Sequence, residues 1–355
     1  MRARTGLTQV VAVAALVSLV GATPALAGTF VYVSNAEDGD IATYAMRPDG
    51  ALTVGARVAA AKIVMPMAVS PDRRFLYAGV RSTPFSVHVY SIDAGTGALS
   101  PLSVSPLSVS PLAESFPYIA LDKTGRFLFG ASYGGHLISV NAVGADGRVA
   151  ATPLQVIPVG RNAHSIRTDG SNRFVFVPTL GTDEIFQFTF DATSGRLSSN
   201  TPAVALMKPS TGPRHFVTSG DNRFLYALSE LLATVTTFSL DAGTGLLTEM
   251  SSASGLPADS KLVPGAPRGA VGAPGGPPPR NTDNDIWAAD IHMTPNGKFL
   301  YISERTSSTL RAFAVEAATG KLTYLTSTPT EQQPRAFWIY PKGRLLGAAG
   351  EDSDT

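Results

Sequence analysis

Short runs of consecutive apolar residues recur at similar intervals along the chain. The seven runs start at Phe30, Phe75, Phe127, Phe174, Phe224, Phe299 and Arg344. Their starts are separated by 45, 52, 47, 50, 75 and 45 positions. A strand with both faces covered carries apolar residues at successive positions, without polar alternation. A period of this size indicates a repeat architecture in which each unit is stacked against its neighbours.

The segments around each run repeat as well. A turn with Asp or Asn and a basic residue precedes most runs, as in residues 71–74 and 295–298. A second strand follows and ends at a turn with Gly, as in residues 241–245, because Gly supplies the positive φ that such hairpins need. Adding one edge strand and one strand before each turn gives four short antiparallel strands per repeat. Seven such repeats predict an all-β fold, a seven-bladed β-propeller. An array of β-sandwiches would not explain seven copies at one period.

The longest interval contains an insertion at residues 257–285, which is rich in Pro and Gly. This composition is typical of a loop. Asp283 and Asp285 near its end could bind calcium, but a solvated acidic loop is the favoured interpretation, and we expect no metal site. The last repeat begins near Arg335 and stops soon after its second strand, and the first starts at its second strand. We therefore expect an incomplete last blade and an open ring.

The first residues have the pattern of a secretory signal peptide. Arg2 and Arg4 precede an apolar run over residues 10–20, and Ala25 to Ala27 form an A-x-A cleavage site. We expect residues 1–27 to be removed and residues 28–355 to form an exported, periplasmic or secreted propeller domain. The apolar run is short for a membrane span, so we expect no membrane attachment after cleavage.

Overall composition excludes several classes of chemistry. The chain has 28 basic and 27 acidic residues and a formal net charge of +1, without a concentrated basic segment, so we expect no nucleic-acid partner. It has no cysteine, which excludes disulfides, thiolate nucleophiles and Cys-zinc sites. Neither G-x-S-x-G nor H-E-x-x-H occurs, so a hydrolase elbow and a zinc-protease motif are unsupported.

Three histidines lie in the strand that precedes the turn, which in a propeller lines the central channel: His164, His215 and His292. Charged residues occur beside them or at the ends of neighbouring strands: Arg214, Glu230, Asp290, Arg305 and Arg335. Arginines in a dehydrated channel bind anionic groups and stabilise an oxyanion. A His or Glu nearby can take a proton from water. This combination without metal ligands suits hydrolysis of an activated, anionic ester.

The chain resembles the propeller lactonases, which include bacterial 6-phosphogluconolactonases of propeller type and fungal carboxymuconate cyclases. The motifs that carry the resemblance are His164-Ser165, Gly212-Pro213-Arg214-His215, Ser229-Glu230-Leu231, residues 287–292, Glu304-Arg305-Thr306 and residues 330–335. The resemblance implies a seven-bladed propeller, lactone ring opening or closing, no cofactor or obligatory metal, and a site at His164, Arg214, Glu230 and Arg305. The chain departs from the family in its export signal and in lacking the C-terminal strands that complete the ring.

We therefore expect a lactone hydrolase acting on a small sugar-acid lactone. His164 or Glu230 is expected to act as general base on water, and Arg214 and Arg305 to hold the anionic group or the developing oxyanion. His215, Asp290, His292 and Arg335 are expected to contact the substrate. Two alternatives stay open, a muconate-type lactonizing cyclase and a non-enzymatic propeller that binds a partner. The sequence leaves the oligomeric state open.

Overall fold

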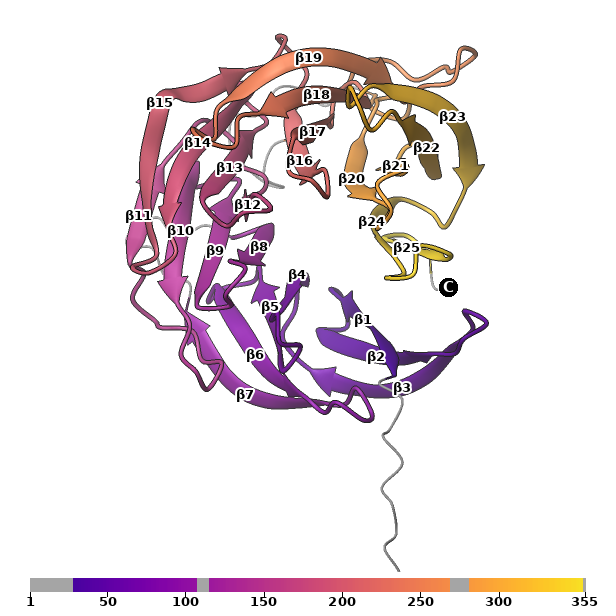
Figure 1. Cartoon of the computed structure of the whole chain (residues 1–355). Coiled ribbons are helices and arrows are strands. Elements are labelled where there is room, and N and C mark those ends of the chain that lie inside the picture. Colours follow the sequence, from indigo (N-terminus) through magenta and orange to yellow (C-terminus); the bar gives the residue numbers. More distant parts are fainter. Residues whose placement is uncertain (1–27, 107–114, 269–280, 354–355) are drawn as a thin grey trace, which may run out of the picture.

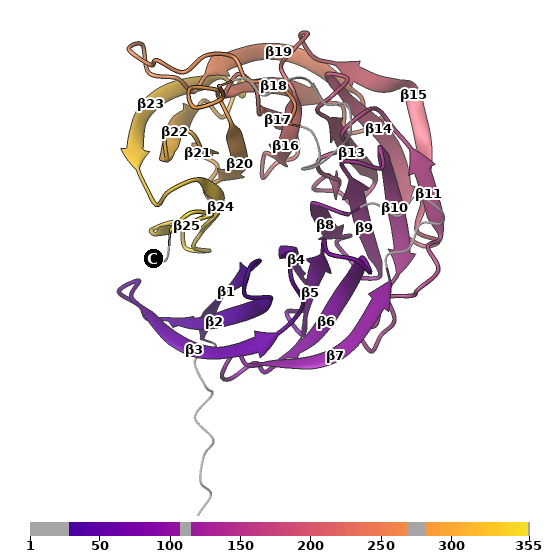
Figure 2. The same ribbon diagram turned by 180° about the vertical axis from the view of Figure 1, so that it is seen from behind.

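The computed structural model describes residues 28–106, 115–268 and 281–353. In this part of the chain every regular element is a β-strand. The sheets stand side by side around a common axis, so that the first strand of most sheets lies innermost (Figures 1 and 2). The prediction of an all-β propeller is confirmed. None of the described residues forms a helix that could cross a membrane.

Seven sheets are present among the described residues, and neighbouring strands within each are antiparallel. The first has three strands: β1 (Thr29–Asn35), β2 (Asp40–Met46) and β3 (Leu52–Ala59). The second is β4 (Val64–Val69), β5 (Phe75–Val80), β6 (Ser86–Ile92) and β7 (Leu99–Pro106). The third is β8 (Tyr118–Leu121), β9 (Phe127–Ser132), β10 (Leu137–Ala142) and β11 (Gln155–Pro158). The fourth is β12 (Arg167–Thr168), β13 (Phe174–Thr179), β14 (Glu184–Asp191) and β15 (Arg196–Leu206).

The remaining sheets follow the same order. The fifth is β16 (Pro213–Thr218), β17 (Phe224–Ser229), β18 (Thr234–Leu240) and β19 (Leu247–Ser254). The sixth is β20 (Ala288–Met293), β21 (Phe299–Glu304), β22 (Thr309–Val315) and β23 (Leu322–Pro329). The last has two strands among the described residues, β24 (Pro334–Ile339) and β25 (Leu346–Gly350). It contacts the first sheet where Leu345 lies against Gly50.

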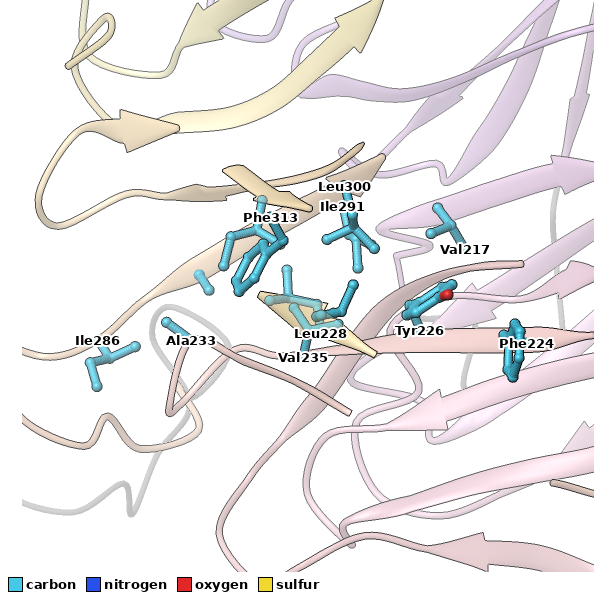
Figure 3. Packing of buried hydrophobic residues seen from close by; sticks show 13 residues of the cluster. Val217, Phe224, Tyr226, Leu228, Ala233, Val235, Ile286, Ile291, Leu300 and Phe313 are labelled. Carbon is cyan, nitrogen blue, oxygen red and sulfur yellow. The ribbon is translucent and has the colours of Figure 1, made fainter. Parts of the chain in front are cut away.

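The hydrophobic core lies between neighbouring sheets. Figure 3 shows the cluster between the fifth and sixth sheets, where Leu228 and Val235 face Ile291, Leu300 and Phe313. Every residue of β5, β9, β13 and β17 is buried. This burial confirms the inference that the apolar runs are strands covered on both faces. Because no sheet can bury both faces alone, each depends on its neighbours for stability.

One contact between sheets recurs around the ring. A phenylalanine at or near the start of one of the long apolar strands packs against the hairpin glycine of the next sheet. The pairs are Phe30–Gly97, Phe75–Gly147, Phe127–Gly195, Phe174–Gly245 and Phe224–Gly320. Each glycine has a positive φ, and the ring leaves no room for a Cβ. Only glycine therefore fits both the turn and the ring.

An arginine covers the other side of several of these rings. The guanidinium of Arg173 lies 5.1 Å from the ring centroid of Phe174 and hydrogen-bonds to the Ala242 carbonyl in the next hairpin. Arg223 repeats this arrangement with Phe224, at 5.1 Å, and donates to the Ala317 carbonyl. The basic residue that follows each turn thus has a structural function, since it ties one sheet to the hairpin of the next.

Phe299 shows what happens without such a partner. It occupies the same position in the sixth sheet, but the last sheet offers it no hairpin glycine among the described residues. Its exposed fraction is 37%, compared with 3% for Phe174 and 6% for Phe224. Without a hairpin of the next sheet to cover it, Phe299 therefore stays more exposed than Phe174 and Phe224.

The described part of the insertion, residues 257–268 and 281–285, is anchored to the sixth sheet. Val263 forms a parallel bridge with Asp285, and Ile286 donates to the Val263 carbonyl. Asp283 is exposed, but Asp285 is only 3% exposed. The expectation of a solvated acidic loop is therefore wrong for Asp285. Among the described residues no group of three or more His, Asp or Glu side chains is arranged to hold a metal ion.

Replacing Gly245 with Ala tests the contact between sheets. Gly245 has φ +74° and its Cβ would clash with Phe174, whereas Gly297 has φ +69° with open space around it. We expect Gly245→Ala to lower the free energy of unfolding by about 2–5 kcal/mol, from backbone strain plus overpacking. The control Gly297→Ala should cost only about 1–2 kcal/mol of backbone strain. Urea unfolding compares the two, and equal losses would show that the ring contact contributes nothing.

Candidate active site

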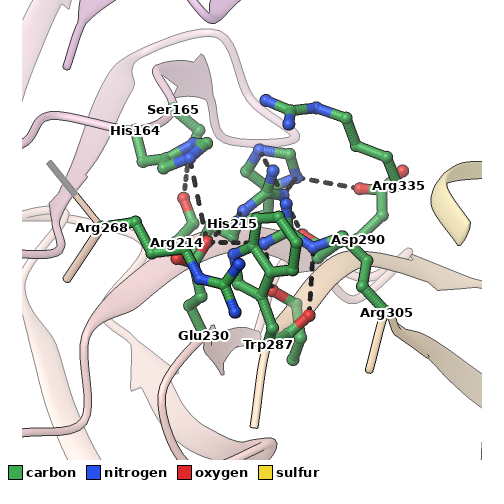
Figure 4. Close-up of polar contacts among 12 residues, drawn as sticks. His164, Ser165, Arg214, His215, Glu230, Arg268, Trp287, Asp290, Arg305 and Arg335 are labelled. Carbon is green, nitrogen blue, oxygen red and sulfur yellow. Dashed lines mark hydrogen bonds and ion pairs between the residues drawn. The ribbon is translucent and has the colours of Figure 1, made fainter. Parts of the chain in front are cut away.

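The inner strands are irregular where the candidate residues lie. In β16 the pairing with β17 shifts between Pro213 and Phe216, and in β20 the pairing with β21 shifts between Ala288 and Ile291. A shift also occurs in β24 between Pro334 and Ala336. Such bulges redirect side chains and occur often beside active sites. They allow the consecutive residues Arg214 and His215 to point into the same space (Figure 4).

Glu230 lies at the centre of the site. It follows β17, and its Oε2 lies 2.8 Å from Arg214 Nε and 3.1 Å from Arg305 Nη2. His164 Nε2 lies 4.0 Å from the same oxygen. The side chains of Arg214, Arg305 and Glu230 are only 1%, 2% and 5% exposed. Two arginines and one glutamate sum to one excess positive charge, which the nearby carboxylate of Asp290 offsets, in a place where water screens charges little.

Arg305 is fixed by its surroundings on the sixth sheet. Its Nε donates to the Trp287 carbonyl at 3.1 Å and its Nη2 to the Ala288 carbonyl at 3.3 Å. Its guanidinium carbon lies 3.6 Å from the ring centroid of Trp287, and that of Arg268 lies 3.5 Å from the same centroid. Glu304, next in the chain, accepts hydrogen bonds from the Trp287 and Ser307 backbone and is fully buried. Arg305 is therefore preorganised before any ligand binds.

A second polar chain runs through Asp290. His215 Nδ1 donates to Asp290 Oδ1 at 2.9 Å, and His292 Nε2 donates to Asp290 Oδ2 at 3.1 Å. With Nδ1 protonated, His215 Nε2 accepts from Arg214 Nη1 at 3.1 Å. The rings of His164 and His215 meet edge to face with centroids 5.3 Å apart. His215 and Asp290 thus hold Arg214 from the side opposite Glu230.

Burial and the charge of Arg214 keep His164 and His215 neutral. Burial, with the positive charge of Arg214 added, lowers the pKa of His164 well below its usual value. The same two causes lower the pKa of His215 to about 3. Burial alone would raise the pKa of Asp290, but His292 and His215 hold it well below its usual value. His164 is therefore an uncharged imidazole at neutral pH, and its Nδ1 has no hydrogen-bond partner among the described residues.

A cavity of about 360 Å³ lies among the inner strands. Tyr118, Arg167 and His292 contribute to its walls. The Tyr118 and His215 rings meet edge to face at 5.0 Å between centroids, so Tyr118 lies between the cavity and His215. The polar cluster around Glu230 and the cavity therefore lie along the same inner surface of the ring.

A family model described as a lactonase, 7-bladed beta-propeller, matches residues 26–355. The chain belongs to this lactonase family. A 6-phosphogluconolactonase of Pectobacterium carotovorum is 36% identical over 323 residues, 91% of this chain and 88% of the relative. One of Serratia proteamaculans is 35% identical over 327 residues, with the same coverage. The solved periplasmic gluconolactonase PpgL of Pseudomonas aeruginosa has a TM-score of 0.78 and 25% identity, covering 92% of this chain and 90% of that one.

Within this lactonase fold, the eight residues singled out in the sequence come from four sheets and lie close to one another (Figure 4). His164, Arg214, Glu230 and Arg305 form the buried cluster. His215, Asp290 and His292 form the adjoining chain. Arg335 pairs with Glu351 at 3.1 Å, and both side chains are about one quarter exposed. His292, at 36%, is the most exposed of the three histidines.

Sequence reasoning missed Arg81. It follows β5 six positions after Phe75, as Glu230 follows Phe224 and Arg305 follows Phe299 by six positions. Burial, with the positive charge of Arg335 added, lowers the pKa of Arg81 to about 10. A search of each repeat for a charged residue six positions after the start of the apolar run would have identified Arg81. Trp287 was present in the family motif, but nothing in the sequence indicated its position between two guanidinium groups.

Removing the central charge should destabilise the lactonase fold strongly. The change Glu230→Gln keeps the shape but leaves Arg214 and Arg305 buried without a counter-charge. We expect the free energy of unfolding to fall by about 3–5 kcal/mol. The matched control Glu351→Gln breaks the more exposed pair with Arg335 and should cost less than about 1 kcal/mol. Urea unfolding of both variants at low and high salt measures the difference, and losses of similar size would contradict the assigned burial.

Proposed function

We propose that this lactonase-family chain is a lactone hydrolase that opens a sugar-acid lactone by the attack of water. The observation that carries the proposal is the neutral His164 beside the buried Arg214–Glu230–Arg305 cluster. Relatives named 6-phosphogluconolactonase and a solved gluconolactonase support this substrate class. The donors of the two arginines suit the negative charge that forms on the carbonyl oxygen during attack.

In the proposed mechanism, His164 accepts a proton from water as the water oxygen bonds to the lactone carbonyl carbon. The carbonyl π electrons move to the oxygen, and Arg214 and Arg305 stabilise the resulting oxyanion. Collapse of this intermediate breaks the bond from the carbonyl carbon to the ring oxygen. The protonated His164 then returns its proton to the ring oxygen, giving a hydroxy acid. Glu230, 4.0 Å from His164 Nε2, stabilises the imidazolium while it exists.

We assign the base to His164 because Glu230 has another function in this arrangement. Both guanidinium groups contact the same Oε2 of Glu230. If Glu230 accepted a proton, it would lose the charge that holds both arginines in place. This loss would come at the moment when the arginines must stabilise the oxyanion. His164 does not hold an arginine in place, and its ring is uncharged at neutral pH. His215, Asp290 and His292 are proposed to position Arg214 and to contact the polar groups of the substrate, together with Arg335.

We further propose that the protein is exported and that its ring is seven-bladed, with the last blade incomplete in this chain. The charged start, the apolar run and the A-x-A site within residues 1–27 support export, although these residues lie outside the described part. The periplasmic setting of the gluconolactonase from Pseudomonas aeruginosa agrees with it. The seven sheets and the family description support the blade number.

Replacing His164 with Gln tests the assignment of the base. We expect turnover of 6-phosphogluconolactone or glucono-δ-lactone to fall by about 10²–10⁴-fold, the range for loss of a general base, with an unchanged urea midpoint. The control is His88→Gln, since His88 lies on β6 away from the site. Retained hydrolysis in His164→Gln would remove His164 from the mechanism. Conversion of muconates instead of sugar lactones would favour the cyclase, and inactivity on both classes would favour a binding module.

The pH profile gives an independent test. His164 works as its neutral form, whose fraction falls only when pH drops through the pKa of the folded protein. Burial places that pKa well below the ordinary value of about 6.5. We therefore expect kcat/KM to stay constant from pH 7.5 to below 6 and to decline only at lower pH. Initial rates corrected for spontaneous lactone hydrolysis measure this, and an inflection at or above pH 6.5 would contradict the assignment.

A further inference from the structure

The pair at the centre of the site has a second copy on the last sheet. Arg335 and Glu351 are separated by 16 positions, as are Arg214 and Glu230. In both cases the arginine lies in a bulge of the inner strand and the glutamate follows the next strand. The difference is exposure, because Arg335 and Glu351 are 25% and 27% exposed, compared with 1% and 5%. The second pair is therefore within reach of a ligand.

Arg81 supplies a further cation, because it follows β5 at the position that Glu230 and Arg305 occupy after β17 and β21 in their own sheets. The positive charge of Arg335 disfavours the charged form of Arg81, and the negative charge of Glu351 favours it. Its Nη1 lies 3.1 Å from the sulfur of Met65, a weak acceptor. Its Nε is buried and has no hydrogen-bond partner among the described residues. A partly buried guanidinium in this state retains hydrogen-bonding capacity for an oxygen ligand.

Arg311 shows how an arginine with a purely structural function is held in this fold. It is buried, and its Nε, Nη1 and Nη2 donate to Thr309, the Gly255 carbonyl and Ser307. Its charge is met by Glu304 at 3.6 Å. Among the residues that the structure describes, Arg81 has no comparable set of oxygen acceptors. The contrast argues against packing as the reason for a cation at this position.

The charges around this end of the ring do not balance. Four arginines, Arg81, Arg214, Arg305 and Arg335, lie in one electrostatically coupled group with three carboxylates, Glu230, Asp290 and Glu351. Figure 4 shows the Arg335 side chain extending across His215, toward the side of the site where His164 lies. The ionised carboxylate of Asp290, beside neutral His215, offsets the excess charge of the Arg214–Glu230–Arg305 cluster. Arg81 with the Arg335–Glu351 pair therefore accounts for the one excess positive charge.

We propose that Arg81 and Arg335 form an anion-binding subsite that holds an acidic substituent of the lactone, a phosphate or carboxylate group. Guanidinium groups bind such oxyanions with two parallel hydrogen bonds. The ligand oxygens take the unused donors of Arg81 and compete with Glu351 for Arg335. The lactone carbonyl then lies at Arg214 and Arg305. The identity of the ligand as a lactone rests on the proposed function, whereas the anion site does not.

The test measures binding and turnover in the full chain. Calorimetric binding of 6-phosphogluconate is compared among wild type, Arg81→Gln, Glu351→Gln and the surface control Arg47→Gln, which lies in an exposed pair. We expect Arg81→Gln to weaken binding by about tenfold or more, and Arg47→Gln to leave it unchanged. Glu351→Gln should tighten binding, because it removes the competing carboxylate. A merely structural function for Arg81 does not predict opposite effects of these two substitutions.

Kinetics identify the substituent. Arg81→Gln should raise KM for 6-phosphogluconolactone by about tenfold and change kcat/KM for glucono-δ-lactone less than twofold. Glucaro-1,4-lactone tests a carboxylate in place of the phosphate. If Arg81→Gln lowers the urea midpoint, the substitution affects the fold. Arg81→Lys and Glu351→Gln are then compared with the wild type instead.

Two results would overturn the subsite: no binding of 6-phosphogluconate by the wild type, or equal binding by the wild type and Arg81→Gln. Binding that depends on Arg81 without turnover of any lactone would instead refute the proposed function and leave the anion site standing.

Discussion

The packing of one aromatic ring between an arginine and the next sheet's glycine determines how the sheets stand around the axis. Phe174 shows it best, with Arg173 over one side and Gly245 against the other. Because the contact recurs at equivalent positions, it holds successive sheets in a similar orientation and brings their first strands together. His164, Glu230 and Arg305 come from the fourth, fifth and sixth sheets, which this contact joins in sequence through Gly245 and Gly320. A residue at the outer hairpins thereby controls geometry at the axis.

Burial of charge is the energetic cost of this site. Desolvating two arginines and a glutamate opposes folding, and good geometry has to offset it. The surroundings of Arg305 provide that geometry through two backbone carbonyls, Glu230 and the face of Trp287. The polar chain through His215 and Asp290 does the same for Arg214. Groups fixed in this way need no rearrangement when charge develops on a substrate, which is why a stability cost can be retained at a functional site.

The period of the apolar runs predicted most of the fold, because strands covered on both faces leave a direct signal in the sequence. The spacing also placed His164, Arg214 and Glu230 at the axis. It could not predict the bulges that let Arg214 and His215 face the same space, since these depend on pairing with the neighbouring strand. Arg81 was missed for a different reason. Its position six residues after Phe75 is visible in the sequence, but its burial near Arg335 requires contacts between sheets that are far apart in the chain.

The recurrence of an Arg–Glu pair with one spacing has an evolutionary consequence. Every repeat presents the same two positions to the axis, one in the inner strand and one after the next strand. Here the fifth sheet carries the buried pair Arg214–Glu230, and the last sheet carries the accessible pair Arg335–Glu351. In the sixth sheet, which lies between them, Ala289 occupies the inner-strand position. At the accessible pair, a substitution of Arg335 or Glu351 can therefore add or remove a charge facing the ligand at little cost to the scaffold. Duplicated repeats give this family a set of independent sites for selection, in which new substrate preferences can arise one residue at a time.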